Sequence, residues 1–381
     1  MSEQQTTGKR KKERHNFDYV LLTVVLFLVG FGLLMIYSTS SYEAGIDYGD
    51  SAYFLKKQMT STLLGFIAMF FVSRVPYQFW KKWDAAAFLG SAVLILLVLS
   101  PLGLTRNGAT RWLDLKIITM QPAEVAKIGA IIYEASIISK LGKSLKTPKG
   151  LAVVLVPPAI LALMLWQITN NMSSAIIVMG IAVAMLFVAV PDYKYFVGLG
   201  ALGIAGVTAI VFYANASDAS GEFRMQRIRA WLNPEAYSTD TAFQTLQALY
   251  AIGSGGIWGK GLGQSMQKRG FLPESQNDMI FSIICEELGL FGAIAVIFLF
   301  IVLIWCCMVI ANNTVDLFGA LLVVGVMSHY AIQVILNIAV VTNTIPNTGI
   351  SLPFISYGGT SVLFLLAEIG IVLNVSKSVR A

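Results

Sequence analysis

Long apolar segments recur along the whole chain, and they constrain its fold more than any other feature. A helix needs roughly 20 apolar residues to cross a bilayer, and ten segments approach or exceed this length. Their bounds are about 19–40, 55–75, 84–102, 122–139, 151–167, 172–190, 195–213, 279–310, 317–340 and 362–376. Hydrophobic residues make up 56% of the chain and charged residues 13%, whereas soluble proteins carry roughly 25% charged residues. The sequence predicts an all-α polytopic membrane protein with about ten transmembrane helices.

An even number of spans places both ends of the chain on one side of the membrane. Lys and Arg are concentrated in the N-terminal tail and in the loops on its side, which predicts cytoplasmic termini. We therefore expect a disordered basic cytoplasmic tail at 1–17, a transmembrane domain at 18–377 and a cytoplasmic tail at 378–381. The first apolar run lacks a small-residue cleavage site, so it is predicted to be a span and not a signal peptide.

Two polar segments are predicted to lie outside the membrane. The longest, 214–277, separates the seventh and eighth spans, and its Thr241–Ile252 stretch has apolar residues at the spacing of an amphipathic surface helix. The other, 342–361, combines Pro and Gly with apolar residues, which predicts a re-entrant segment packed against protein. The eighth apolar segment is too long for one perpendicular crossing, so its first turns should tilt or lie at the interface.

Several functional classes are disfavoured. The three cysteines lie in apolar runs, and His15 and His329 are the only histidines and are far apart, so no zinc or Ser–His site is expected. Basic residues are placed as topology signals, which argues against nucleic-acid binding. The glycine run 253–263 lacks the spacing of a nucleotide-binding loop. It is better interpreted as a tight loop whose backbone amides could face a phosphate.

Asp278 is the candidate catalytic group. It follows Asn277 at the start of the eighth apolar segment, where an Asp side chain can cap a helix, and position alone leaves capping and catalysis open. If Asn277 caps instead, partial burial could make Asp278 basic enough to accept a hydroxyl proton. Glu274 is a close neighbour in sequence. Glu286 and Glu287 lie about 12 Å further along the helix and are expected to pair with basic groups.

Cationic side chains could hold an anionic substrate group. Lys127 lies inside an apolar helix, three residues after Glu124, so an internal ion pair and a buried cation for a diphosphate are both open. Arg224 and Arg227 share one helical face and could bind phosphate oxygens. The other external cations are Arg111, Arg229, Lys260, Lys268 and Arg269.

The chain resembles the SEDS family of polytopic membrane glycosyltransferases, which comprises FtsW, RodA and SpoVE. Five stretches carry the resemblance in the family's order: NGATRWLDL (107–115), QPAEVAK (121–127), QALYAIGSGGIWGKGLGQS (247–265), FLPESQNDMIFSIICEELG (271–289) and NTIPNTGISLPFISYGGTS (343–361). By these motifs the family's catalytic aspartate corresponds to Asp278, its G-A-x-R-W tryptophan to Trp112 and its Q-P-[AS]-E-x-x-K lysine to Lys127. The resemblance is greatest to the FtsW group.

The resemblance implies a peptidoglycan glycosyltransferase that polymerises lipid II at the outer face of the bacterial plasma membrane during cell division. It also implies a class B penicillin-binding protein as partner, together with other membrane proteins of the divisome. The alternatives are a RodA-type elongation polymerase and a lipid II flippase or transporter. The family's proline–aspartate pair between spans five and six is replaced by Asn170 and Asn171, for which we expect a structural or hydrogen-bonding role.

The mechanism expected from these residues is an inverting β-1,4 transfer. Asp278 removes the proton of the acceptor hydroxyl, and Lys127, Arg111 and Arg227 hold the charge of the departing diphosphate. Trp112 is expected either to stack on sugar or lipid or to anchor the interface. Mg²⁺ or Mn²⁺ is an optional helper with no residue assigned to it.

Overall fold

The computed structural model describes residues 18–106, 108–116, 119–190, 194–216, 223–237 and 242–379. Its helices are α1 (Tyr19–Tyr48), α2 (Tyr53–Val72), α3 (Gln78–Lys82), α4 (Asp84–Leu97), α5 (Pro122–Leu141), α6 (Pro148–Gln167), α7 (Met172–Ala189), α8 (Lys194–Ala216), α9 (Phe223–Leu232), α10 (Phe243–Gly255), α11 (Ile280–Asn313), α12 (Leu317–Val341) and α13 (Ser361–Ser376). Short 3₁₀ turns cover Gly142–Lys146 and Pro234–Tyr237. The predicted tail 1–17 lies outside the described residues.

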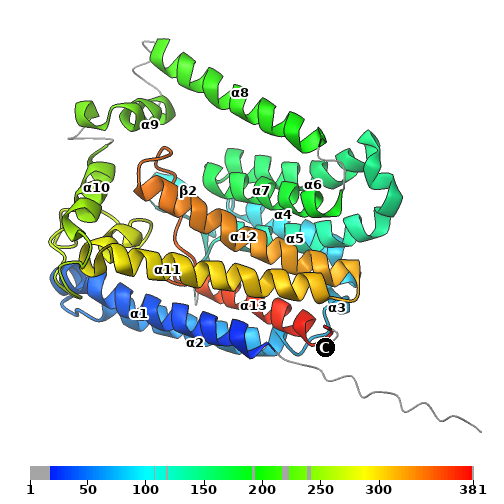
Figure 1. Ribbon diagram of the computed structural model, residues 1–381, viewed down its shortest axis with the longest axis horizontal. Coiled ribbons are helices and arrows are strands. Elements are labelled where there is room, and N and C mark those ends of the chain that lie inside the picture. The colour runs from blue at the N-terminus through cyan, green and yellow to red at the C-terminus, as the bar shows by residue number, and fades with distance from the viewer. Residues whose placement is uncertain are drawn as a thin grey trace, which may run out of the picture.

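Most long helices run side by side in one bundle (Figure 1). α11 and α12 pack together at its centre, with α1 and α10 against α11, and α5 and α7 against α12. α2 packs on α1 and α13, α4 on α5, and α6 on α7, whereas α8 packs mainly on α9. α10 confirms a helix in the predicted stretch with a buried face that includes Leu246, Ala248 and Ala251, although Tyr250, expected on the apolar face, is exposed.

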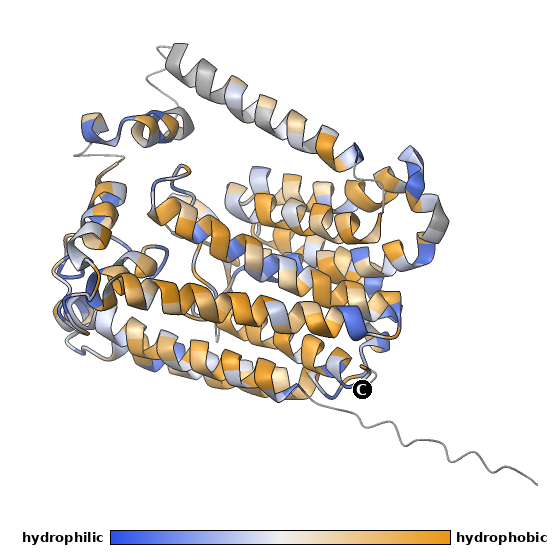
Figure 2. Ribbon diagram, viewed as in Figure 1, coloured by the Kyte–Doolittle hydropathy of each residue, from blue (hydrophilic) through white to orange (hydrophobic). Residues whose placement is uncertain are grey.

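The bundle has the surface of a membrane protein. Each of the ten predicted spans corresponds to a helix, and within the described residues α1, α6, α7, α11 and α12 are long and apolar enough to cross a bilayer. Large apolar side chains such as Phe27, Phe298 and Trp305 point outward, which soluble proteins rarely permit over a wide surface. Figure 2 shows apolar residues along the helices and hydrophilic residues in the loops at their ends. The protein is a multi-pass membrane protein; ten crossings and cytoplasmic termini remain predictions.

The all-α prediction missed a small sheet between α4 and α5. Strands β1 (Gly103–Arg106), β2 (Ala109–Asp114) and β3 (Thr119–Met120) form an antiparallel sheet in the order β1-β2-β3. The longest strand has only six residues, so little alternation is available to reveal it in the sequence. The sheet matters because β2 carries Arg111 and Trp112.

α11 is broken near its start, at Gly289, where φ is 66° and ψ is −164°. The break sets the first turns of α11 apart from the rest of the helix, and their predicted tilt or interfacial position stays a prediction. The glycine loop after α10 fills the break: Lys260 and Gly261 amides donate to the carbonyls of Glu286 and Glu287, both at 2.9 Å. The Leu290 amide donates to the Gly256 carbonyl at 3.0 Å. The loop amides of Lys260 and Gly261 thus bind α11 and do not face a phosphate.

Residues 342–360 form an irregular segment that enters the bundle, as predicted for a re-entrant loop. Ile350, Leu352, Phe354 and Ile355 are all buried. α1 allows this close approach only because residue 32 is glycine. A Cβ there would lie 2.3 Å from the Phe354 carbonyl oxygen. The re-entrant segment is therefore fixed against a membrane-spanning helix by direct backbone contact.

Gly32→Ala should destabilise the protein by about 1–3 kcal/mol, because the added methyl group overpacks against backbone that has no room to move. Thermal unfolding of the purified protein in detergent measures this. Gly30→Ala is the matched control, since a Cβ at this position in the same helix meets nothing within 4 Å. The control should be neutral or slightly stabilising, because alanine favours helix. Equal effects of the two substitutions would contradict the close packing.

Candidate active site

Asp278 lies in the turn just before α11, with 9% of its surface exposed. Met279 is the N-cap residue of α11 and no side chain caps the helix, so the capping interpretation of Asp278 is wrong. Asn277 does not cap either, because its amide donates to the Glu274 carboxylate. The Asp278 carboxylate is therefore not committed to the helix end.

The backbone of Asp278 is fixed by a buried amide of α12. Asn337 Nδ2 donates to the carbonyls of Asp278 and of Ile350, both at 2.7 Å. One turn earlier, Gln333 Nε2 donates to the Ser351 carbonyl at 3.0 Å. These amides join α12, the re-entrant segment and the Asp278 turn. The sequence analysis missed them, although two amides four residues apart in an apolar helix were a usable signal.

The Asp278 carboxylate is buried yet incompletely bonded. Its Oδ1 has no hydrogen-bond partner among the described residues. Burial first, and then the nearby Glu274 carboxylate, raise its pKa to about 7, against the opposing effects of adjacent backbone amides and of Arg227. A Cβ at Gly349 would lie 3.8 Å from Oδ2, an ordinary contact distance, so the re-entrant segment lies directly beside the carboxylate. Such a carboxylate is half ionised near neutral pH and can exchange a proton with a hydroxyl.

Two arginines reach this region from different elements. On α9, Arg227 Nη1 donates to the Asn347 carbonyl at 3.3 Å, and Trp231 Nε1 donates to the Asn343 carbonyl at 3.0 Å, so α9 is docked on the re-entrant segment. Burial and the like charge of Arg227 lower the pKa of Arg111 below its usual value. Arg227 therefore acts electrostatically on both Asp278 and Arg111. Two arginines that lie near each other, one of them also acting on Asp278, favour an anionic ligand.

Arg111 is held by the turn between α6 and α7. Its Nε donates to the Thr169 carbonyl at 3.3 Å, and its Nη2 donates to the Asn170 carbonyl at 2.8 Å. Asn170 has φ of 51°, a conformation that Asn tolerates well. Asn171 caps α7 by accepting from the Ser174 amide at 3.0 Å. The structural or hydrogen-bonding role predicted for Asn171 is confirmed.

The remaining predicted residues lie as follows. Lys127 on α5 is 2% exposed and forms an ion pair with Glu124 at 2.9 Å, which confirms the ion-pair interpretation. Among the described residues, no contact joins Lys127 to Asp278. Trp112 lies half-buried next to Arg111 on β2. Arg224 belongs to α9, but its side chain lies outside the described residues. Of the predicted set, Asp278, Glu274, Arg227 and Arg111 are thus brought together.

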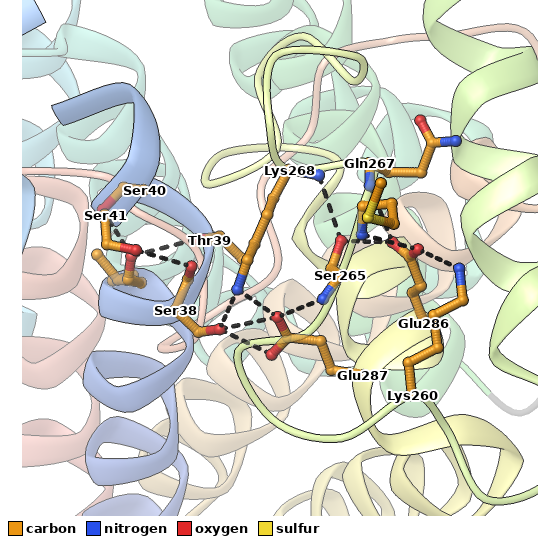
Figure 3. Close-up of polar contacts among 12 residues, drawn as sticks. Ser38, Thr39, Ser40, Ser41, Lys260, Ser265, Gln267, Lys268, Glu286 and Glu287 are labelled. Atoms are coloured by element: carbon orange, nitrogen blue, oxygen red, sulfur yellow. Dashed lines mark hydrogen bonds and ion pairs between the residues drawn. The ribbon is translucent and has the colours of Figure 1, made fainter. Parts of the chain in front are cut away.

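Glu286 and Glu287 form what we call the glutamate clamp, which fastens the loop before Asp278 to α11 (Figure 3). Glu286 accepts from Lys260 Nζ at 2.7 Å and from the Ser265 hydroxyl. Glu287 accepts from Lys268 Nζ at 2.7 Å and from the hydroxyl of Ser38 on α1. Both carboxylates are fully buried. The prediction that they pair with basic groups is confirmed.

No metal centre is evident in the described part of the chain, where no group of three or more His, Cys, Asp or Glu side chains is close enough to hold an ion. Mg²⁺ is usually bound by one or two carboxylates together with substrate phosphates. A divalent ion here would have to arrive largely on the substrate.

The sequence is similar to those of known proteins. A sequence model of the FtsW, RodA and SpoVE family, described as "Cell cycle protein", matches residues 19–381. Stage V sporulation protein E of Bacillus subtilis is 38% identical over 95% of this chain and 98% of its own length. The probable peptidoglycan glycosyltransferase FtsW of Geobacter sp. strain M18 is 36% identical over 96% of this chain and 98% of its own length.

Solved structures share the fold. A chain from a peptidoglycan synthase complex, described as coordinating polymerization and crosslinking, superposes with a TM-score of 0.77 at 24% identity. The match covers 94% of this chain and 97% of the other. The rod shape determining protein RodA of Thermus thermophilus superposes with a TM-score of 0.66 at 23% identity, covering 94% of this chain and 96% of the other.

Glu287→Gln should destabilise the protein by about 3–5 kcal/mol, because it leaves the buried Lys268 cation without its counter-charge. Adding Lys268→Met removes that cation, so the double variant should recover most of the loss in thermal unfolding. Asp50→Asn is the matched control, because the Lys56–Asp50 pair has the same 2.7 Å separation on an exposed surface. It should leave the stability close to that of the wild type, because an exposed ion pair contributes little. A Glu287→Gln variant as stable as the control would contradict the clamp.

Proposed function

The chain belongs to the FtsW, RodA and SpoVE family of cell cycle proteins, and from this membership we propose that it is a peptidoglycan glycosyltransferase that polymerises lipid II. The observation that carries the proposal is the buried Asp278 carboxylate, with a pKa of about 7 and with Arg227 acting on both Asp278 and Arg111. Polymerisation of a lipid-linked diphosphate sugar needs a base for the acceptor hydroxyl and positive charge for the leaving group. The site supplies both.

In the proposed step, Asp278 accepts the proton of the 4-hydroxyl of the acceptor N-acetylglucosamine. The resulting oxygen nucleophile attacks the anomeric carbon of the donor sugar, opposite the α-linked diphosphate. A C–O bond forms on one face as the bond to diphosphate breaks on the other, so the product is β-1,4-linked. One carboxylate suffices, because the reaction inverts the configuration without a covalent enzyme intermediate.

The departing lipid diphosphate gains negative charge as its bond breaks, and it needs no proton if that charge is held. Arg111 and Arg227 are the proposed partners, because a guanidinium binds phosphate oxygens in a planar, bidentate geometry. Arg224 is proposed to assist from the same helix as Arg227. Lys127 keeps a proposed secondary role, in which diphosphate competes with Glu124 for its ammonium group. Trp112, next to Arg111, is proposed to contact sugar or lipid.

A divalent cation is optional in this scheme. Mg²⁺ or Mn²⁺ bound to the diphosphate would supply additional positive charge to the leaving group. The protein residues act in the same way with or without it: Asp278 accepts the proton, and Arg111 and Arg227 orient the diphosphate.

We place the reaction at the outer face of the bacterial plasma membrane during cell division. The distribution of Lys and Arg supports cytoplasmic termini, which puts Asp278 on the opposite side. Identities of 36% and 37% to two proteins named FtsW support division, with RodA-type elongation as the alternative. The shared fold with a synthase complex that coordinates polymerization and crosslinking supports a class B penicillin-binding protein as partner, alongside other divisome membrane proteins.

A lipid II flippase or transporter is the second candidate. It is favoured by the buried His329–Glu368 pair between α12 and α13, whose Nδ1–Oε2 distance is 2.9 Å, since ionisable groups within membrane helices often mark transport pathways. Polymerisation distinguishes the candidates, because transport needs no base beside a sugar hydroxyl.

Asp278→Asn should reduce lipid II polymerisation at least about 100-fold, because the amide keeps the shape of the carboxylate but cannot accept the proton. The assay uses full-length protein with its transpeptidase partner and labelled lipid II, and it separates glycan chains by gel electrophoresis. Asp114→Asn, an exposed position on β2, is the matched control and should polymerise normally. Wild-type rates for Asp278→Asn would refute the base assignment and leave transport as the better candidate.

The pH dependence of kcat/KM should rise through about pH 7, because only the ionised form of Asp278 acts as the base. Glu274→Gln removes a negative charge that raises the pKa of Asp278, so the midpoint should move to lower pH. Arg227→Gln removes a positive charge that lowers this pKa, so the midpoint should move to higher pH. Shifts in the same direction, or no shift in either variant, would show that another group sets the profile.

A further inference from the structure

A second hollow lies beside the glutamate clamp, away from the neighbours of Asp278 described above. It is a cavity of about 530 Å³ between α1 and the loop that follows α10. Its lining includes Leu34, Tyr37, Ser41 and Tyr42 of α1 together with Lys268 and Arg269 of the loop. We call it the α1 cavity. No residue of its lining takes part in the proposed transfer.

The charged side chains that line the α1 cavity are both cationic. Lys268 and Arg269 are its only charged lining residues, and no carboxylate lines it. Lys268 Nζ lies between α1 and the α11 carboxylates (Figure 3), bonded to Glu287 at 2.7 Å and to Ser38 Oγ at 3.0 Å. Arg269 is exposed, and within the described ranges it has no ion-pair partner. A fixed cation and an unpaired one therefore face the same space, which favours an anion.

The opposite wall of the α1 cavity is apolar and open. Leu34, Tyr37 and Tyr42 are each 46% exposed, and Leu262 from the loop is 49% exposed. Leu34 and Tyr37 lie just past the middle of α1, and Tyr42 lies nearer the end that meets the loop. Tyrosines at such a position are typical of the level of lipid headgroups. The α1 cavity is thus polar and cationic on the loop side and apolar along the helix.

We propose that the α1 cavity binds an anionic phospholipid, with its phosphate at Lys268 and Arg269 and the start of an acyl chain along Leu34 and Tyr37. A free phosphate would leave the apolar wall without a partner. The lipid-linked substrate is not required, because the lining is separate from the residues around Asp278. Basic residues at the membrane surface attract anionic lipids for the same electrostatic reason.

A lipid bound in the α1 cavity would also stabilise the loop that leads to Asp278. Lys268 belongs both to the α1 cavity and to the glutamate clamp, which fastens the loop leading to Asp278. A phosphate at Arg269 would bring negative charge close to the buried Lys268. Occupancy would then hold the loop against α1 and raise the stability of the whole protein, as any ligand of the folded state does.

Native mass spectrometry of the full-length protein in detergent tests the proposal, with dioleoyl phosphatidylglycerol and dioleoyl phosphatidylcholine as probes. The wild type should retain phosphatidylglycerol at least about tenfold more tightly than phosphatidylcholine. Arg269→Gln should abolish most of that preference, and Ser41→Trp, which fills the cavity, should weaken phosphatidylglycerol binding about tenfold. Lys149→Gln removes an exposed cation from α6 and is the matched control, with wild-type binding expected.

Thermal unfolding without lipid identifies variants that are misfolded. Arg269→Gln is expected to unfold at the wild-type temperature, because the Arg269 side chain is exposed. Added phosphatidylglycerol should raise the unfolding midpoint of the wild type and of Lys149→Gln, and not that of Ser41→Trp. Wild-type binding by both cavity variants would overturn the proposal. Displacement of phosphatidylglycerol by inorganic phosphate, or tighter binding of undecaprenyl phosphate, would overturn the assignment to a phospholipid.

Discussion

At Gly289 the backbone of α11 leaves helical geometry, and the freed carbonyl and amide groups bond to the glycine loop that follows α10. In a bilayer an unbonded backbone group costs several kcal/mol, so a broken membrane helix needs another segment at the break. The loop fits because residues 259 and 289 are glycines; a Cβ on Gly289 would lie 2.4 Å from the Gly259 amide nitrogen. The glutamate clamp then fixes the next part of the loop. The contacts at Gly289 and the glutamate clamp together fix the loop that leads to Asp278.

The same arrangement explains why Asp278 is reactive. The side chain of Asn337 donates to the backbone carbonyl of Asp278 and also bonds the re-entrant segment. The Asp278 carboxylate, by contrast, has one oxygen without a hydrogen bond. A native pKa above that of the unfolded chain means that ionisation opposes folding, increasingly so as the pH rises from about 4 to about 7. Glu286 and Glu287, also buried, are fully paired instead. The fold thus gives Glu286 and Glu287 charged partners and leaves Asp278 with an oxygen that has none.

The helices could be predicted from the sequence because apolar length is a local property. Asp278 could be nominated because a carboxylate at the start of an apolar helix is costly and conspicuous. The partners of these groups could not be predicted, because they are distant in the chain: Ser38 bonds Glu287 across 249 positions, and Arg111 bonds Asn170 across 59. For Lys127, the spacing in the sequence allowed both an ion pair and a ligand site. Only the fold shows that Glu124 lies beside it. The short sheet and Asn337 were missed for the same reason, because their meaning depends on what packs against them.

The central claim is that burial makes Asp278 a base with a pKa near neutrality. Infrared difference spectroscopy during a pH titration of the full-length protein tests it directly, with Asp278→Asn as the reference that identifies the band. The account predicts a protonated carboxyl band that is absent from Asp278→Asn and disappears as the pH rises through about 7. A carboxylate at Asp278 that remains ionised down to pH values near 4, as an exposed aspartate does, would contradict it.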